Sequence, residues 1–268
     1  MARITVFEAG HCTHPGCVAV RGGRWGACVF PARAYLIEAG DTRWLWDTGY
    51  ANHFHDHTRS GVFAWYRRVT PVVFEPRQAV VAQLRAAGLA PRDLTGVVLS
   101  HFHGDHIAGL RDCQGTRFIC HGGGWQAVRR LRGWRALRHA FVPGLIPDDF
   151  EARAAAVESF ESIALPASLS PFCEGWALPG TGGEVVVVEL PGHAAGHLGA
   201  FVDTPQGWVL LASDAAWSPR SYREGVGPSR LAHLIMDDSR AYENTLHRLQ
   251  RLHQGGHARI WLTHEGDC

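Results

Sequence analysis

The chain has 268 residues, of which 46% are hydrophobic and 19% are charged, and this apolar content excludes a mainly disordered protein. Its 26 basic residues, all of them arginine, nearly balance 25 acidic residues, and the net charge of +1 argues against a nucleic acid partner. Without lysine, the chain has neither a lysine Schiff base nor the lysine of a P-loop.

The cysteines and the N-terminal residues bear on where the protein works. There are seven cysteines, an odd number, and no C-x-x-C motif, which is not the pattern of a secreted disulfide framework. Residues 1–8 resemble a strand rather than a signal peptide, and no run of 18 apolar residues is present. We therefore expect a cytoplasmic protein with reduced thiols and no membrane partner.

The first half of the chain begins with strand-like segments and continues with an aromatic, histidine-rich stretch and a helix. Strands are expected at residues 4–7, 34–38, 43–46 and 97–99, an irregular surface excursion at 52–69, and a helix at 76–88. Apolar residues recur at helical spacing in the last of these segments, and Gly88 suits its C-terminal end.

The second half returns to strands after a helical segment. A strand is expected at 117–120, a mainly helical and cap-like segment at about 125–157, strands at 184–190, 199–203, 208–212 and 258–262, and an amphipathic helix at 241–252. Each half ends with a strand followed by histidine, and no low-complexity linker separates the halves. The sequence therefore predicts a single domain over residues 1–268, in which two αβ halves pack sheet to sheet.

Three imidazoles and a carboxylate lie within six residues, in the segment His101-Phe102-His103-Gly104-Asp105-His106. This segment directly follows an apolar strand. His101 and His103 point the same way while the chain is extended, and Asp105 and His106 project after the chain turns. Imidazole nitrogen combined with carboxylate oxygen suits Zn²⁺, and also iron or manganese. The segment thus predicts ligands for two neighbouring metal positions.

Further metal-capable residues follow other apolar strands. His193 and His197 belong to the segment Pro191-Gly192-His193-Ala194-Ala195-Gly196-His197, Asp214 follows the strand at 208–212, and His264 follows the last strand. The carboxyl ends of strands are where an open sheet places its site. A second cluster, His11, Cys12, His14 and Cys17, has suitable residue types but matches no closed tetrahedral spacing.

Taken in order, these motifs resemble those of the metallo-β-lactamase superfamily, whose early Asp-Thr-Gly is similar to Asp47-Thr48-Gly49. The resemblance covers residues 30–264 and implies an α/β fold, a four-layer αβ/βα sandwich with the metals at one edge between the sheets. It implies that one metal ion is held by His101, His103 and His193, a second by Asp105, His106 and His264, and both by Asp214. By the same resemblance, Asp47 and His197 orient the neighbouring groups.

Two divalent metal ions, zinc first with iron or manganese as alternatives, can share a bridging hydroxide that attacks a carbonyl. Asp214 can pass a proton to the leaving group, so that Asp105 and Asp214 are the catalytic candidates. The sequence thus predicts a metal-dependent hydrolase of an ester, lactone, thioester or amide bond.

Within the superfamily, the chain looks most similar to the N-acyl homoserine lactone lactonases, because Ala9-Gly10-His11-Cys12 resembles a segment near their start and Asp214 is present. Those lactonases carry a tyrosine three residues after the bridging aspartate, where this chain has Trp217. Tyr222 is the candidate to supply a hydroxyl instead. A thioesterase or β-lactamase-like hydrolase is the main alternative, followed by an iron-dependent redox enzyme and a non-catalytic metal-binding protein.

The rim around a small-molecule substrate is expected from residues 52–69 and 125–157, because the metal ligands use the loops of the scaffold itself. Both stretches are rich in aromatic residues: Phe54, Phe63, Trp65, Tyr66, Trp125, Trp134 and Phe141. Trp65 and Trp134 are the candidates for substrate contact. The competing interpretation is that these stretches form the interface of a homodimer.

Overall fold

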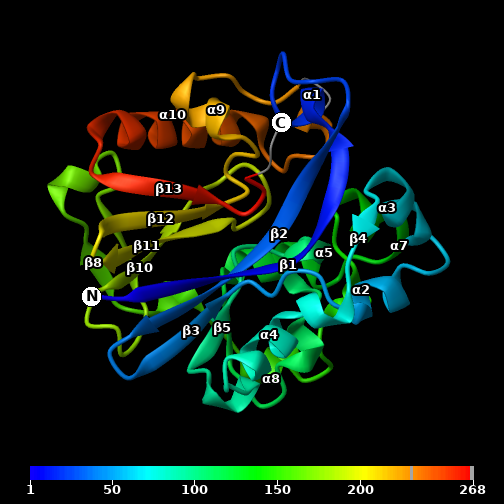
Figure 1. Ribbon diagram of the computed structural model, residues 1–268, viewed down its shortest axis with the longest axis horizontal. Coiled ribbons are helices and arrows are strands. Elements are labelled where there is room, and N and C mark those ends of the chain that lie inside the picture. The colour runs from blue at the N-terminus through cyan, green and yellow to red at the C-terminus, as the bar shows by residue number, and fades with distance from the viewer. Residues whose placement is uncertain (230–231, 266–268) are drawn as a thin grey trace.

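Two β-sheets face each other, and helices cover the outer side of each (Figure 1). The computed structural model describes residues 1–229 and 232–265, apart from the side chain of Leu234. The first sheet has the strand order β4-β1-β2-β3-β5-β6-β7 and the second β13-β12-β11-β10-β9-β8. The strands are β1 (Arg3–Pro15), β2 (Ala27–Ala39), β3 (Thr42–Trp46), β4 (Val72–Val73), β5 (Gly96–Val98), β6 (Phe118–Cys120), β7 (Ala154–Ala156), β8 (Ser162–Ala164), β9 (Glu174–Ala177), β10 (Val185–Glu189), β11 (Leu198–Thr204), β12 (Gly207–Ser213) and β13 (Ala258–Leu262).

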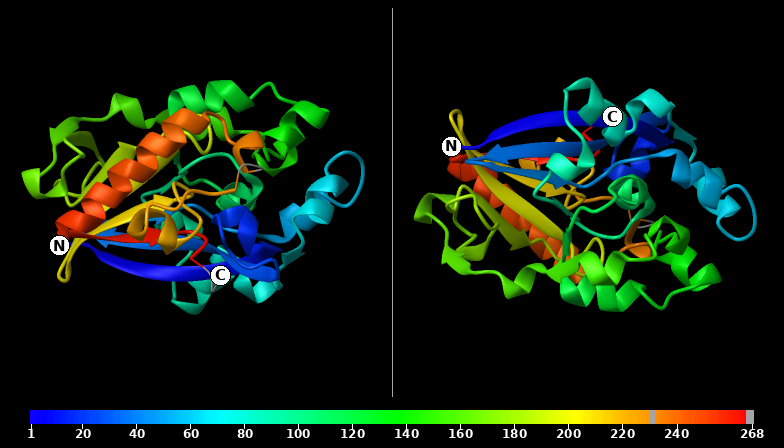
Figure 2. Two further views of the ribbon diagram at one scale, coloured as in Figure 1. Left: turned by 90° about the horizontal axis from the view of Figure 1, so that it is seen from above. Right: turned by 90° about the horizontal axis from the view of Figure 1, so that it is seen from below.

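Three buried apolar clusters fill the spaces between four layers, which Figure 2 shows from above and from below. The middle cluster lies between the sheets and includes Trp46. On β10, Val185 and Val187 join this middle cluster, whereas Val186 and Val188 join the cluster beneath α10 (Ser239–Gly255). This alternation is the two-residue period of a strand that is buried on both faces. The arrangement confirms the predicted four-layer sandwich.

The long helix α10 confirms the amphipathic helix predicted at 241–252. The Asp238 side chain accepts hydrogen bonds from two amides of the first turn, and Gly256 ends the helix in the left-handed conformation. Thr245 lies on the buried face and donates to the Pro191 carbonyl at 2.7 Å. The helix therefore holds in place the segment that leads to His193.

The other helices are short. They are α1 (Gly16–Ala19), α2 (Asn52–His57), α3 (Ala64–Val69), α4 (Val80–Ala86), α5 (Gly104–Ile107), α6 (Gly122–Val128), α7 (Gly133–Arg138), α8 (Phe150–Arg153) and α9 (Pro219–Arg223). The stretch 52–69, expected to be irregular, forms α2 and α3. The segment 125–157 is helical only in part, because Ala154–Ala156 pairs with β6 and extends the first sheet. Tertiary pairing here overrides the helix propensity of alanine.

The hairpin of β1 and β2 is much longer than the strands predicted at 4–7 and 34–38. Each strand has 13 residues, and their pairing continues from Arg3↔Glu38 to Pro15↔Ala27, with a shift of register between Glu8 and His11. The far half of the hairpin thereby extends beyond β3, and β1 pairs there with the short strand β4 at His11 and Cys12 (Figure 1).

Gly192 lies where no side chain fits. Its φ is +124°, and a Cβ atom there would lie 2.1 Å from the backbone nitrogen of Tyr242 on α10. We expect Gly192→Ala to lower the free energy of unfolding by more than about 3 kcal/mol, because the cost of the strained backbone adds to the cost of overpacking against α10. Denaturant unfolding measures this loss. The matched control is Gly26→Ala, since a Cβ at Gly26 meets nothing within 4 Å; equal stability of the two variants would contradict the packing argument.

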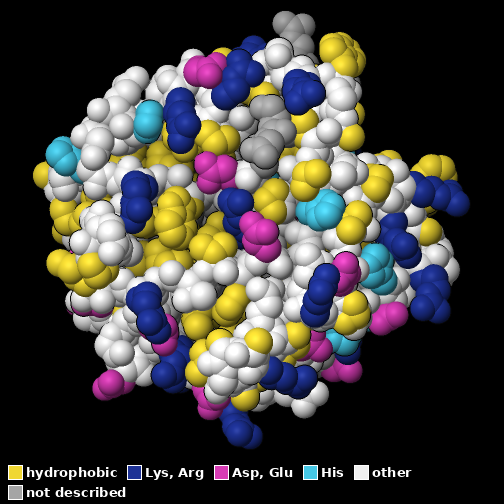
Figure 3. All heavy atoms as spheres, viewed as in Figure 1, with side chains coloured by type: hydrophobic (Ala, Val, Ile, Leu, Met, Phe, Trp, Pro, Cys, Tyr) yellow, Lys and Arg dark blue, Asp and Glu magenta, His cyan; other side chains and the backbone are white. Residues whose placement is uncertain are grey.

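The surface charges and the cysteines of the described residues agree with the composition of the chain. On the face in Figure 3, acidic and basic side chains are interspersed, in keeping with the net charge of +1. Within the described ranges, no helix is long and apolar enough to span a bilayer. The six cysteines in these ranges are free, and Cys268 lies outside them.

Candidate metal centre

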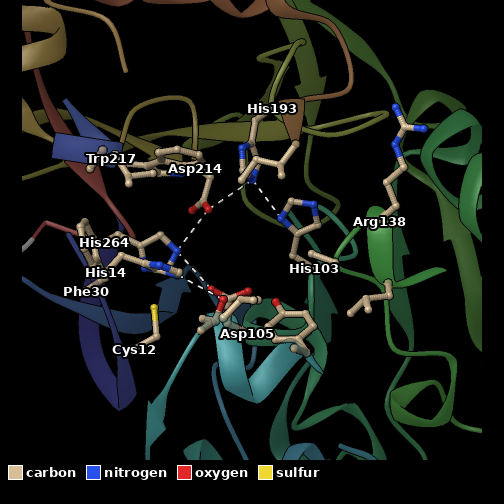
Figure 4. Close-up of a pocket in the computed structure, with 18 of the residues that line it drawn as sticks. Cys12, His14, Phe30, His103, Asp105, Arg138, His193, Asp214, Trp217 and His264 are labelled. Carbon is tan, nitrogen blue, oxygen red and sulfur yellow. Dashed lines mark hydrogen bonds and ion pairs between the residues drawn. The ribbon is translucent and has the colours of Figure 1, made fainter. Parts of the chain in front are cut away.

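Histidine and aspartate side chains from several strand ends meet at one edge of the sandwich (Figure 4). They form two groups, and within each group the ligand atoms lie within 4.8 Å of one another. One group is His101, His103, His193 and Asp214, and the other is Asp105, His106 and His264. The structure thus brings together all seven residues that the sequence motifs single out, and it buries all of them except the half-buried His103.

The carboxylate of Asp214 lies between the two groups. Its Oδ1 is 3.3 Å from His106 Nε2, and its Oδ2 is 3.3 Å from His193 Nε2. The same Oδ2 is 3.1 Å from His264 Nε2. One carboxylate therefore reaches imidazoles of both groups, as a bridging ligand must.

Asp47 supports the metal motif from the end of β3. Its Oδ1 accepts a hydrogen bond from the Ser100 amide at 2.8 Å, and its Oδ2 accepts from the Ser100 hydroxyl at 2.7 Å and from His106 Nδ1 at 2.8 Å. Asp47 is fully buried and has a left-handed backbone with φ of 59°. This conformation is costly for a residue with a side chain, and the hydrogen bonds to the motif offset the cost. Asp47 thereby turns His106 Nε2 toward Asp214.

His197 and His264 are each oriented by a backbone carbonyl. His197 Nδ1 donates to the Leu190 carbonyl at 3.0 Å, and its Nε2 accepts from the Asp214 amide at 3.2 Å. His264 Nδ1 donates to the Pro31 carbonyl at 2.8 Å, which leaves its Nε2 facing Asp214. His197 consequently positions the Asp214 backbone, whereas His264 offers a ligand nitrogen.

Two buried imidazole nitrogens of this cluster, His101 Nε2 and His193 Nδ1, lack a hydrogen-bond partner among the described residues. His106 Nε2 and Asp214 Oδ1 face each other at 3.3 Å without a well-formed hydrogen bond. An unpaired buried polar atom costs about 1–3 kcal/mol, so such atoms are rare without a ligand. Metal coordination would satisfy them, and this set of nitrogen and oxygen donors suits divalent ions. The residues therefore fit two such ions.

The two groups differ in their protonation. Burial lowers the pKa of His103 to about 4, and burial together with neighbouring imidazoles holds the pKa values of His101 and His193 well below the ordinary value. Burial would also lower the pKa of His106, but the surrounding carboxylates, led by that of Asp214, raise it to about 10. Three imidazoles are thus neutral at pH 7, whereas His106 carries a proton.

A cavity of about 670 Å³ opens above this cluster. Its walls are mostly apolar or aromatic: α3 contributes Trp65 and Tyr66, α7 contributes Trp134 and Arg138, and Trp217 follows β12. Trp65 is 48% exposed and Trp134 is 65% exposed, so both stand at the mouth. The structure thus brings parts of the two expected rim stretches to the cavity.

Comparison with known proteins agrees with this geometry. The metallo-beta-lactamase superfamily matches residues 29–260 of the chain. The chain belongs to this superfamily.

Individual relatives of the superfamily are similar at low identity. A "Probable metallo-hydrolase" of Mycobacterium tuberculosis is 30% identical over 193 residues, which are 67% of this chain and 55% of that protein. The chain therefore spans little more than half the length of that relative. N-acyl homoserine lactonase AiiB of Agrobacterium fabrum is 25% identical over 239 residues, or 88% of this chain and 79% of AiiB.

Solved structures share the fold. An N-acyl homoserine lactone hydrolase with the product N-hexanoyl-L-homoserine bound at its catalytic metal centre superposes with a TM-score of 0.72. The match covers 98% of this chain and 92% of the other, at 20% identity.

The prediction that Tyr222 supplies a hydroxyl in this metallo-β-lactamase site is wrong. Tyr222 is buried on α9 and its ring faces His253 of α10, with the ring centroids 5.3 Å apart. The buried side of α9 packs against α10 rather than facing the cavity, so Tyr222 does not line it. Trp217 does line the cavity, and its ring stands edge-on to His193.

The first hairpin contributes cavity residues that the sequence reasoning missed. Cys12, His14 and Phe30 line the cavity, whereas His11 and Cys17 do not. The cluster of His11, Cys12, His14 and Cys17, which has ligand-type residues but no tetrahedral spacing, is therefore split, and it forms no metal-ligand group among the described residues. Burial raises the pKa of Cys12 to about 11, so its thiol stays neutral. The two-residue spacing of Cys12 and His14 could have indicated this position, because residues two apart on a strand point to the same face.

Metal loading is expected to release protons. His106 is protonated at pH 7 because its pKa is raised to about 10, and a coordinating imidazole must be neutral. The apparent affinity for Zn²⁺ should therefore rise with pH between 6 and 8, about tenfold per pH unit for each proton displaced. Calorimetric titration of the metal-free protein with Zn²⁺, in buffers of different ionisation enthalpy, counts the protons. A count of zero at pH 7 would contradict the protonated His106.

Proposed function

We propose that the protein is a dinuclear metal-dependent lactonase that opens lactones bearing an apolar substituent. One juxtaposition carries this proposal: seven ligand-type side chains cluster at the base of a large cavity with mainly apolar walls, and five of them line it. These five are His103, Asp105, His193, Asp214 and His264. The similarity to AiiB over 88% of the chain supports a lactone as the substrate class.

The metal ligands have defined places in this proposal. One ion would be held by His101, His103 and His193, the second by Asp105, His106 and His264, and Asp214 would contact both. When bound, the ions supply Lewis acidity, which makes a water nucleophilic near neutral pH and polarises the substrate carbonyl. Zinc is the ion we propose first, and iron or manganese suit the same donors.

In this proposal, Asp214 moves the proton. Burial would raise the pKa of Asp214, but His264 and His106 outweigh burial and hold it well below the ordinary value. Its carboxylate is therefore unprotonated at neutral pH and can accept a proton from the attacking water. It can then deliver this proton to the ring oxygen as the acyl C–O bond breaks, which yields a hydroxy acid.

The walls of the cavity suit an alkyl or acyl chain. Trp65 and Trp134 at the mouth and Trp217 inside offer flat apolar area. Arg138 also lines the cavity and can donate hydrogen bonds to a polar group on the chain. A homodimer formed through the same exposed aromatic residues remains a separate prediction.

A substrate panel with metal analysis tests the function. Metal-replete protein is assayed with γ-decanolactone, γ-butyrolactone, a decanoyl thioester and a penicillin, and its metal content is measured in parallel. We expect two ions per chain and fastest turnover of γ-decanolactone. Trp134→Ala should reduce the preference for the long chain about tenfold, because apolar contact with the chain is lost. Faster hydrolysis of the thioester or the penicillin would favour the alternative hydrolases instead.

A further inference from the structure

Tyr66 is the one tyrosine of the chain that lines the cavity. All five tyrosines lie in the described ranges. Tyr35 donates to the Leu262 carbonyl at 3.2 Å, and the hydroxyl groups of Tyr50 and Tyr242 are wholly enclosed and lie outside the cavity lining, that of Tyr50 beside the Cys12 thiol. With Tyr222 packed against α10, Tyr66 alone can present a phenol hydroxyl to a ligand.

The ring of Tyr66 is held firmly in its place on α3. It is only 7% exposed and stands edge-on to the fully buried Phe54, with ring centroids 5.2 Å apart and planes at 83°. The amide of Thr70 donates to the Tyr66 carbonyl at 2.8 Å and closes the last turn of the helix. A side chain fixed in this way presents its hydroxyl without a large loss of conformational entropy.

Gly104 brings this hydroxyl next to the metal motif. Gly104 lies between His103 and Asp105, and a Cβ built on it would be 3.0 Å from Phe54 Cε2 and 3.6 Å from Tyr66 Oη. A larger residue at position 104 would press on Phe54, against which the Tyr66 ring packs. Because glycine stands there, the hydroxyl lies against the backbone of the motif, one residue before Asp105.

The hydroxyl is free to donate a hydrogen bond. The Gly104 amide lies beside the phenol oxygen, but the O–H group has no acceptor among the residues that the structure describes. Burial, followed by the charges of Asp105, Cys12 and Asp214, raises the pKa of the Tyr66 hydroxyl well above its ordinary value, and these three residues line the same cavity as Tyr66. A donor with no protein acceptor at this place is available to an oxygen atom of the substrate.

We propose that Tyr66 donates a hydrogen bond to the carbonyl oxygen of the substrate and takes the place of the hydroxyl that Trp217 lacks. This inference rests on the proposed cleavage of an ester carbonyl. As the carbonyl carbon becomes tetrahedral, negative charge grows on that oxygen, and a prepositioned donor stabilises the transition state more than the bound substrate. Trp217 then serves as an apolar wall beside His193.

The test compares Tyr66→Phe with the matched control Tyr50→Phe, which removes an enclosed hydroxyl outside the cavity lining. On γ-decanolactone, we expect Tyr66→Phe to lower kcat about 10²-fold with little change in KM. Its metal content and thermal midpoint should equal those of the wild type. Tyr50→Phe should retain the wild-type kcat. Adding Trp217→Tyr to Tyr66→Phe should restore part of the loss.

Each outcome decides the assignment. An unchanged kcat in Tyr66→Phe, a loss confined to KM, or an equal loss in Tyr50→Phe overturns it, even where the wild type is a good lactonase. If the wild type hydrolyses no member of the panel, the proposed function fails separately. Tyr66 is then judged by calorimetric titration with 4-hydroxydecanoate, which Tyr66→Phe should bind about tenfold more weakly. Absent or equal binding would overturn the role of Tyr66.

Discussion

Asp214→Asn is expected to lower kcat by about 10³-fold while KM changes little, because general acid–base groups contribute about 10²–10⁴-fold. The carboxylate of Asp214 lies within 3.3 Å of His106 and His193 and within 3.1 Å of His264. An asparagine has similar shape but carries no negative charge and cannot accept the proton of the attacking water. Steady-state kinetics on the best lactone of the panel measures the effect.

The matched control for this variant is Asp203→Asn, which makes the same chemical change on β11 outside the cavity lining. It should leave kcat and KM as in the wild type. Metal content is measured for both variants, so that loss of an ion is separated from loss of the proton acceptor. A change in the Asp214→Asn variant confined to KM would show that Asp214 only binds substrate.

His103→Ala is expected to lower kcat by at least about 10³-fold while the fold is retained. His103 is half-buried, lies in the turn before α5 and makes no capping hydrogen bond with its side chain. Its removal therefore leaves no cavity in the apolar core, but it takes one ligand from the group that includes His101 and His193. Metal analysis should find at most one firmly held ion per chain.

His139→Ala is the matched control, because His139 is an exposed histidine that ends α7. This variant should keep two ions and the wild-type turnover. Circular dichroism and thermal unfolding of both metal-free variants should match the metal-free wild type. A His103→Ala variant that still binds two ions and turns over lactone would remove His103 from the ligand set.

The position of the metal ligands could be predicted from the sequence because strand ends are local features. Val97 and Val98 are a short apolar strand, and the residues that follow it are bound to emerge at the edge of the sheet. The same holds for His193 after β10 and His264 after β13. Pairing with parallel and antiparallel neighbouring strands then brings these strand ends together at one edge. The family resemblance indicated which residues share each metal ion.

The lengths of strands and the rim could not be predicted in the same way. Ala154–Ala156 is a strand only because β6 offers it an edge with which to pair. The hairpin of β1 and β2 continues to Pro15 and Ala27 through pairing across 13 residues, which periodicity in one strand does not reveal. Both features depend on partners that are distant in the chain.

The sequence by itself determined the superfamily, the sandwich and the seven ligand-type residues, since those depend on residue types at the ends of regular strands. Only the tertiary structure decided which aromatic residues face the cavity. Tyr222 and Tyr66 both lie on short helices outside the sandwich, and the direction of such a helix is set by what it packs against. Packing against α10 turns Tyr222 away, whereas Phe54 and the bare backbone of Gly104 leave Tyr66 beside the metal motif.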